Sequence, residues 1–127
     1  MNCPCTSGNK YEDCCQPFHQ GKLPDTALQL MRSRYAAYAL CLPEYIIQTT
    51  YPDGPQFKSN TTQWSREITE FHAKTTFKKL EILHFQDATV AFVAHLAQGE
   101  KDVSFTEHSS FIKIRGKWFY IAPLETR

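Results

Sequence analysis

The chain has 127 residues, of which 42% are hydrophobic and 13% aromatic, so it is long enough to bury one sizeable core. Its formal charge of +1 is too small to predict a nucleic-acid or membrane partner. No stretch approaches the roughly 18 apolar residues of a transmembrane helix, and the N-terminus has no signal-peptide pattern. We therefore expect one domain with a short appendage, in the cytoplasm and without a membrane partner.

The first segment concentrates the cysteines of the chain. Four of the five lie in MNCPCTSGNKYEDCC, as the pair Cys3 and Cys5 and the pair Cys14 and Cys15, with eight residues between the pairs. In a reducing compartment such a cluster favours metal binding over a disulfide framework. A structural Zn²⁺ takes four soft ligands at about 2.3 Å, and Gly8 gives the chain freedom to turn back. The spacing predicts a structural Zn²⁺ held by these four thiolates.

Three alternatives to this zinc site stay open. A disulfide within either pair would be strained, but a bridge between the two pairs is sterically possible and would make a disulfide-linked or redox-active tip. A chance cluster in a disordered leader would hold no ligand at all. His19 could replace one thiolate, although four cysteines already complete the coordination shell.

A linker and a first helix are expected next. Residues 16–24, QPFHQGKLP, have the composition of a linker, with Phe18 and Leu23 as anchors onto the body. Asp25 is the expected N-cap, and Pro43 is expected to end the helix. Between them, apolar side chains recur at steps of three and four, as in an amphipathic helix packed on a core. They are Leu28, Met31, Tyr35, Tyr38 and Leu42.

Other residues of this first helix receive structural interpretations. Arg32 and Arg34, in LMRSRY, are expected to be solvated rather than bound to an anion. Cys41 is expected to be a buried small hydrophobic residue, because no neighbouring feature would lower the pKa of its thiol.

Two more helices complete the first half. Residues 44–51, EYIIQTTY, predict a short helix that accepts Pro43 in its first turn and that the turn YPDGP ends. Trp64, Ile68 and Phe71, spaced by four and three, predict a third helix that starts near Asn60. A capping box at that start is also expected.

The second half has the period of strands. LEILHF alternates, and ATVAFVAHLA is apolar on both faces, as expected of a central strand covered on each side. VSFTEHSSFIKI predicts a long strand with a bulge or bend near Ser109 and Ser110, and WFYIA predicts the last strand. Helices followed by a meander of four antiparallel strands give an α+β order.

The cysteine segment resembles a known motif. CPCTSGNKYEDCC is similar to the SEC-C motif, the small zinc-binding tail of the bacterial preprotein translocase ATPase. Thr6 stands where the motif usually has glycine, from which we expect that the backbone at this position does not require a positive φ. Glu12 and Asp13 replace the basic residues common before the closing cysteines, which weakens the expectation of a basic contact surface.

The whole chain resembles a larger family. Its order of elements, with LMRSRYAAY, LEIL, EHSSF and GKWFYI, is similar to the uncharacterised bacterial YchJ family from Cys3 to Ala122. The resemblance implies a SEC-C motif at residues 1–19 and a nuclear transport factor 2-like domain at residues 20–127. In that cystatin-like cone, a long bent sheet wraps around a helix and leaves a concave interior.

Our first functional interpretation is a non-enzymatic accessory or adaptor protein. Four thiolates leave no open coordination position, which a catalytic zinc needs, so the SEC-C tip is expected to mediate contact with a macromolecule. Lys10 and Tyr11, between the two cysteine pairs, are the expected contact residues. The expected partner is a protein or ribonucleoprotein, and the sequence leaves open whether the chain forms a homodimer.

The second interpretation is a small-molecule-binding protein or an enzyme that uses the cavity of the cone. Glu107 shares a strand face with Val103 and Phe105, so its carboxylate is expected to point into an apolar cavity. Burial there would raise its pKa and suit it to act as a general acid or base. His84 and His95 are the candidates to complete such a site. In the opposing interpretation, Glu107 pairs with Arg34 or Lys113 and the histidines are ordinary strand residues.

Other chemistries find little support. The sequence has no G-x-S-x-G, no H-E-x-x-H and no glycine-rich phosphate loop. Two small basic clusters lie near aromatic residues that could stack on bases: Lys78 and Lys79, and Lys113, Arg115 and Lys117. Clusters of this size are ordinary on solvated strands, so nucleic-acid binding is not expected.

Overall fold

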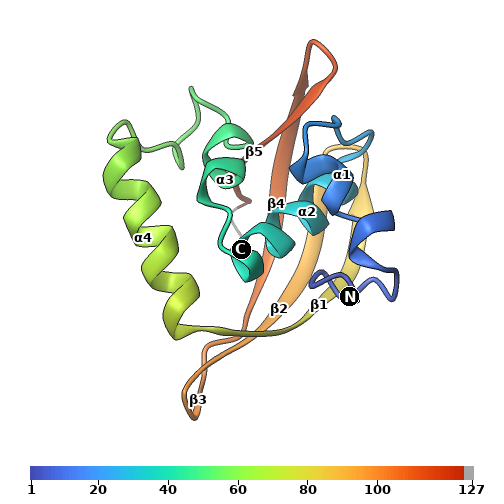
Figure 1. Cartoon of the computed structure of the whole chain (residues 1–127). Coiled ribbons are helices and arrows are strands. Elements are labelled where there is room, and N and C mark those ends of the chain that lie inside the picture. Colours follow the sequence, from blue (N-terminus) through green and yellow to red (C-terminus); the bar gives the residue numbers. More distant parts are fainter. Residues whose placement is uncertain (125–127) are drawn as a thin grey trace.

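The computed structural model describes residues 1–124 and places helices against one face of a curved antiparallel sheet (Figure 1). The helical elements are η1 (Tyr11–Asp13), α1 (Gln16–His19), α2 (Ala27–Leu40), α3 (Pro43–Gln48) and α4 (Thr61–Lys74). The strands are β1 (Thr76–Gln86), β2 (Thr89–Gln98), β3 (Lys101–Asp102), β4 (Phe105–Ile114) and β5 (Lys117–Pro123). This order confirms the α+β prediction. The last three residues of the predicted body domain lie outside the described residues.

α2 is the helix around which the sheet curves. The side chain of Thr26, not the predicted Asp25, caps it by accepting a hydrogen bond from the amide of Gln29 at 3.1 Å. The helix ends earlier than predicted, because Cys41 adopts a left-handed φ of 59°. Pro43 therefore does not end α2 but occupies the first turn of α3. Cys41 is half-buried at this cap, so the prediction of a buried thiol was wrong.

The third helix starts where the sequence predicted. Asn60 caps α4, since its side-chain oxygen accepts a hydrogen bond from the amide of Gln63 at 3.1 Å. Trp64 and Ile68 are buried in a cluster with side chains of α2 and α3. Over residues 1–124, every helix falls short of the length and apolarity needed to cross a bilayer.

The sheet has the strand order β1-β2-β4-β5, and the short β3 pairs with the end of β2. On β2 the buried side chains alternate and pack against α2: they are Val90, Phe92, Ala94 and Leu96. The opposite face of β2 is mostly half-buried. The prediction of a strand fully covered on both sides was therefore wrong, because the helices cover only one face.

An irregularity in the β4–β5 pairing decides on which face of the sheet Tyr120 lies. Ser110 pairs with Ala122 and Phe111 pairs with Tyr120, so Ile121 is an extra residue on β5. The predicted bulge is confirmed in position, but the extra residue lies on the partner strand. As a result Tyr120 lies opposite Phe111, on the concave side of the sheet.

The segment predicted as a linker is partly structured. Residues 16–19 form α1, which contacts α2, so this half of the predicted linker was wrong. Phe18 is half-buried, and Nζ of Lys22 lies over its ring, 5.9 Å from the ring centre. Leu23, the second predicted anchor, is 48% exposed and does not act as one.

Candidate functional site

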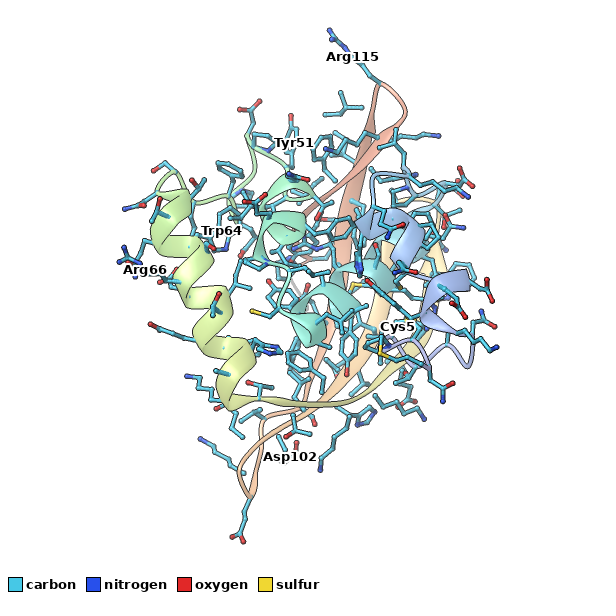
Figure 2. All side chains as sticks on the ribbon, viewed as in Figure 1. Cys5, Tyr51, Trp64, Arg66, Asp102 and Arg115 are labelled. Atoms are coloured by element: carbon cyan, nitrogen blue, oxygen red, sulfur yellow. The ribbon has the colours of Figure 1, made fainter. Side chains whose placement is uncertain are left out.

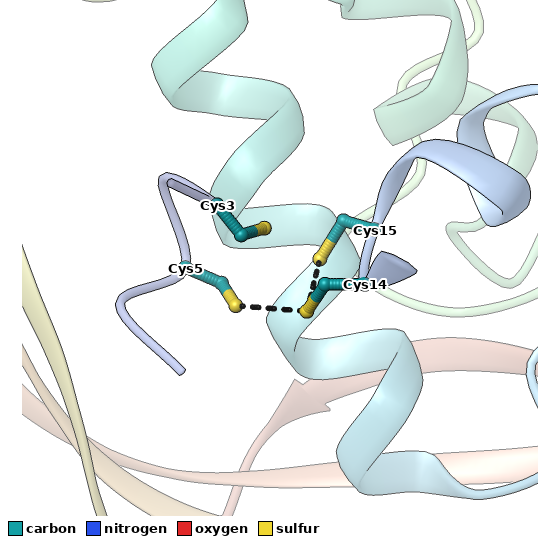
Figure 3. Close-up of side chains that lie close together, drawn as sticks. All are labelled: Cys3, Cys5, Cys14 and Cys15. Atoms are coloured by element: carbon teal, nitrogen blue, oxygen red, sulfur yellow. Dashed lines mark hydrogen bonds between the residues drawn. The ribbon is translucent and has the colours of Figure 1, made fainter. Parts of the chain in front are cut away.

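The four N-terminal cysteines converge on one point (Figure 3). Their sulfur atoms all lie within 4.8 Å of one another. The Sγ–Sγ distance is 3.6 Å between Cys5 and Cys14 and 3.9 Å between Cys14 and Cys15. A tetrahedron with metal–sulfur bonds of about 2.3 Å has sulfur–sulfur edges of about 3.8 Å. The four cysteines are free thiols with the spacing that a tetrahedral metal ion requires.

Short-range backbone bonds bring the two cysteine pairs together. The amide of Cys3 donates to the carbonyl of Asn9 at 2.9 Å, and Asn2 forms an antiparallel β-bridge with Lys10. The segment therefore folds back on itself. Gly8 supports this reversal with a φ of 95°, as expected from the sequence. The turn of η1, which follows directly, places Cys14 and Cys15 next to Cys3 and Cys5.

The cluster is part of the main core rather than an isolated tip. Cys3, Cys5 and Cys15 are at most 3% exposed and pack with Leu30 and Met31 of α2. Figure 1 shows the N-terminal segment beside α2, on the side away from α4. The metal site is therefore packed into the body, although all four of its ligands come from the N-terminal segment.

The thiols of the cluster differ in how readily they ionise. Burial raises the pKa of Cys3 to about 11. A hydrogen bond from the Cys15 thiol lowers the pKa of Cys5 to about 4 and correspondingly raises the pKa of Cys15. A cation that binds the cluster would allow the remaining thiols to ionise.

Arg32 supplies positive charge beside the cluster. Its Nη1 donates to the carbonyl of Cys5 at 3.3 Å and lies 3.9 Å from the Cys5 sulfur. The prediction that Arg32 is simply solvated was therefore wrong, and its guanidinium would offset part of the charge of four thiolates. Nothing in the sequence indicates this role, because it depends on how the N-terminal segment packs against α2.

Thr6 fastens the cluster to the edge of the sheet. Its Oγ1 accepts a hydrogen bond from the amide of Leu80 at 3.0 Å and donates to the Leu80 carbonyl at 3.3 Å. Its φ is 60°, so the prediction that the backbone at this position does not require a positive φ was wrong. Threonine is strained in the left-handed region, and its two bonds to β1 offset that strain.

Substituting Thr6 should separate strain from hydrogen bonding. Thr6→Val should lower the free energy of unfolding by about 1–3 kcal/mol, because valine keeps the shape and strain but loses both bonds. Thr6→Gly should cost less, because glycine relieves the strain while losing the same bonds. Urea denaturation of the metal-loaded proteins measures both changes. A glycine variant as unstable as the valine variant would contradict this balance.

The other predicted residues of the cysteine segment differ in accessibility. Lys10 is exposed, whereas Tyr11 is half-buried and its hydroxyl donates to Nδ1 of His19 at 2.6 Å. Nε2 of His19 donates to the carbonyl of Ser33 at 2.8 Å, and burial lowers the pKa of this histidine. Both ring nitrogens are engaged, so His19 does not lie among the metal-ligating atoms. It connects the cysteine segment to α2.

A separate pocket of about 350 Å³ opens on the concave side of the sheet, between α2, α4 and the strands. Glu107 lines it together with Phe105, so the prediction that this carboxylate faces an apolar cavity is confirmed. Its Oε2 accepts hydrogen bonds from Ser109 at 2.5 Å and from Tyr120 at 2.9 Å. Glu107 is thus held by hydroxyls rather than by the direct ion pair considered from the sequence.

The two predicted histidines lie on the other face of the sheet. Glu107 pairs with Phe92 on the concave side, whereas His95 contacts Glu81, with 2.9 Å between Nε2 and Oε1. His84 is exposed on the far part of β1. Strand alternation separates both rings from Glu107, so the predicted three-residue site is not formed.

Arg34 is the buried cation of the pocket. It is only 6% exposed, and its Nη1 donates to the carbonyl of Ile46 and to the hydroxyls of Thr49 and Thr50. The guanidinium lies 4.6 Å from the centre of the Tyr120 ring. Burial lowers the pKa of Arg34 and raises that of Tyr120. The prediction of a solvated Arg34 was wrong, because α3 closes over it.

Neither Arg34 nor Tyr120 was predicted from the sequence to line the pocket, although Arg34 was considered as an ion-pair partner of Glu107. Arg34 belongs to a basic pair in a helix, a pattern typical of exposed positions. Tyr120 lies in an apolar strand, and the face of the sheet on which its side chain lies depends on the extra residue Ile121. The predicted bulge was the one available signal, but it did not show which strand holds the extra residue.

Comparisons with known families match both parts of the chain. The family described as the YchJ middle NTF2-like domain matches residues 26–123. The SEC-C motif matches residues 2–17.

Curated relatives cover almost the whole chain. A UPF0225 protein of Actinobacillus succinogenes is 40% identical, over 94% of this chain and 79% of the relative. A UPF0225 protein of Haemophilus influenzae is 39% identical, over 96% of this chain and 76% of the relative.

Two solved structures share the fold. The solution structure of a SEC-C motif containing protein from Rhodopseudomonas palustris superimposes with a TM-score of 0.81 at 32% identity and covers 100% of both chains. A crystal structure of a SEC-C motif containing protein from Psychrobacter arcticus gives a TM-score of 0.75 at 28% identity, over 98% of this chain and 82% of that one.

Proposed function

Because the chain belongs to the YchJ family, with a SEC-C motif ahead of an NTF2-like domain, we propose that it is a non-enzymatic, zinc-binding accessory or adaptor protein of the bacterial cytoplasm. One observation carries this proposal: four sulfur atoms lie within 4.8 Å of one another, and three of the cysteines are buried in the core. Four thiolates complete a tetrahedral shell, so the metal has no position for a substrate.

Zinc is the metal that this donor set favours. A tetrahedral site of four sulfur ligands suits Zn²⁺ or iron, and closed sites of four cysteines are typical of structural zinc. The residues that hold it are Cys3, Cys5, Cys14 and Cys15. When bound, the ion cross-links the two cysteine pairs and so fixes the fold of the N-terminal segment that packs on α2. All five cysteines are free, which agrees with a reducing compartment.

The surface over the metal cluster is the proposed contact surface. It presents Lys10 to solvent, together with the exposed acidic residues Glu12 and Asp13. This mixture of charges suits a protein surface better than a nucleic-acid backbone, which requires clustered cations. We therefore propose a protein, free or within a ribonucleoprotein, as the partner, contacted by Lys10 and by the exposed part of Tyr11.

Affinity capture from a cell extract tests the contact surface. Lys10→Glu should lose a partner that the wild type retains, because it reverses the charge of an exposed side chain without disturbing the cluster. Glu107→Gln is the control, since it lies in the separate pocket and should retain the partner. Nuclease treatment distinguishes a protein contact from one made through RNA. If Lys10→Glu captures the same proteins as the wild type, the proposed surface is wrong.

The pocket supports a second candidate function, small-molecule binding. The observation that favours it is a carboxylate, Glu107, positioned by two hydroxyls inside a cavity of about 350 Å³. Cavities of this size and apolar character bind small ligands in many proteins. A catalytic role for Glu107 as acid or base belongs to the same candidate.

A further inference from the structure

The walls of the pocket are mainly aromatic. Eight aromatic side chains line it, Trp64, Phe71 and Phe105 among them. Figure 2 shows Trp64 pointing from α4 toward the sheet, whereas Arg66 of the same helix points to solvent. Aromatic walls favour a flat apolar body, which they contact by burial and ring stacking.

Two charged side chains of the pocket keep unused hydrogen-bonding atoms. Oε2 of Glu107 accepts two hydrogen bonds, whereas its Oε1 has no partner within residues 1–124. Arg34 donates only through Nη1 within the same residues, which leaves Nε and Nη2. Tyr120 lies between them, since its ring contacts the guanidinium and its hydroxyl donates to the carboxylate. The pocket therefore offers an acceptor on Glu107 and donors on Arg34, with the Tyr120 side chain connecting the two residues.

A third polar group lines the same pocket. Tyr35 is only 4% exposed, and its hydroxyl has no hydrogen-bond partner within residues 1–124. The amide of Lys79 lies near this hydroxyl, but no acceptor takes its proton. A buried hydroxyl without an acceptor is costly, but this one lies beside the backbone of β1 and is not counted among the contacts of the ligand.

The charges that line the pocket balance. Arg34 and Lys58 are positive, and Glu67 and Glu107 are negative. Lys58 and Glu67 pair with each other at 2.9 Å and are 55% and 44% exposed, so they form the rim. Inside, a charged ligand attracted by one of Arg34 and Glu107 would be repelled by the other. An uncharged ligand meets no such opposition.

We propose that the pocket binds an uncharged ligand with a flat apolar body and one group that both donates and accepts hydrogen bonds, such as an amide. The donor of this group faces Oε1 of Glu107 and its acceptor faces Arg34. This inference rests on the second candidate function and names the class of ligand for the same pocket. It does not depend on the contact surface over the metal cluster.

Three compounds with the same ring test the ligand class. Benzamide, benzoate and benzylammonium are titrated at pH 7 into the full-length, metal-loaded protein, and the amide and Trp64 indole signals are followed by NMR. Benzamide should bind saturably and move the signals of Glu107 and Trp64. It should bind about tenfold more tightly than either charged compound, the size of one hydrogen bond to a charged group.

A charge change in the pocket tests the role of Glu107. Glu107→Gln removes the negative charge beside Arg34, so the ratio of benzamide to benzoate affinity should fall by about tenfold. Glu81→Gln is the matched control, because it makes the same change on the opposite face of the sheet, beside His95. The control should leave the order of the three compounds unchanged.

Each other outcome has a definite meaning. If a charged compound binds the pocket as tightly as benzamide, the ligand class is wrong while the small-molecule candidate stands. If none of the compounds moves the pocket signals, both are wrong. If the ratio of benzamide to benzoate affinity is the same in Glu107→Gln and the wild type, Glu107 does not contact the ligand.

Discussion

Replacing Cys5 with serine should abolish stoichiometric zinc binding and lower the free energy of unfolding by more than about 3 kcal/mol, because the binding energy of a structural zinc is part of the folding energy. Cys5 is completely buried and its sulfur lies 3.6 Å from that of Cys14. The wild type should contain about one zinc per chain under reducing conditions. Elemental analysis and urea denaturation of the same samples measure both quantities.

Cys41→Ser is the control for this experiment. Cys41 is half-buried at the end of α2, outside the metal cluster, and its sulfur lies 3.9 Å from the Thr69 hydroxyl. This variant should keep its zinc and most of its stability. A strong chelator added to the wild type should reproduce the loss seen with Cys5→Ser. Metal-free wild-type protein, or zinc retained by Cys5→Ser, would contradict the proposed metal centre.

Replacing Arg34 with methionine should lower the free energy of unfolding by about 2–3 kcal/mol, the usual cost of removing a charged donor from buried hydrogen-bond acceptors. Methionine keeps an apolar stem of similar length but removes the donor to Ile46, Thr49 and Thr50 and the contact with the Tyr120 ring. It also leaves Glu107 as the only charge inside the pocket. Urea denaturation of the metal-loaded protein measures the loss.

A double-mutant cycle shows whether Arg34 and Glu107 are coupled. Adding Glu107→Gln to Arg34→Met should restore about 1 kcal/mol, because it removes the carboxylate left without a cation. Arg66→Met is the control, since Arg66 is exposed on α4 and should change stability by less than about 0.5 kcal/mol. Strictly additive losses would show that the two charges act independently. A loss no larger than that of Arg66→Met would contradict the structural role of Arg34.

Successive residues of α2 face the two sites. Arg32 contacts the carbonyl of Cys5, and the Ser33 carbonyl accepts from His19. Arg34 and Tyr35 line the pocket. The metal cluster and the pocket therefore share the middle of α2, and loss of the metal is expected to disturb the pocket as well.

Local features were the ones that could be predicted from the sequence. The spacing of the two cysteine pairs specified a four-thiolate cluster, because short-range turns bring residues nine apart in the chain back together. Asn60 and Gln63 specified the start of α4 for the same reason, since an N-cap involves neighbouring residues only. Alternation along β4 placed Glu107 on the concave face, because strand geometry repeats every two residues.

Long-range features were not predictable in the same way. The strained φ of Thr6 is stabilised by bonds to Leu80, which lies in another element. The burial of Arg34 depends on α3 folding over α2, and the position of Tyr120 depends on one extra residue in β5. His95 meets Glu81 instead of Glu107 because pairing between strands decides which faces coincide.

By itself, the sequence determined a metal-binding cysteine cluster, an α+β body and a carboxylate on the inner face of a strand, because each depends on spacing along the chain. Only the tertiary structure decided that the cluster is part of the core and that Arg34, Tyr120 and Glu107 share one pocket. Those arrangements follow from how separate elements pack and in which register they pair, and side-chain spacing within a single element does not encode either.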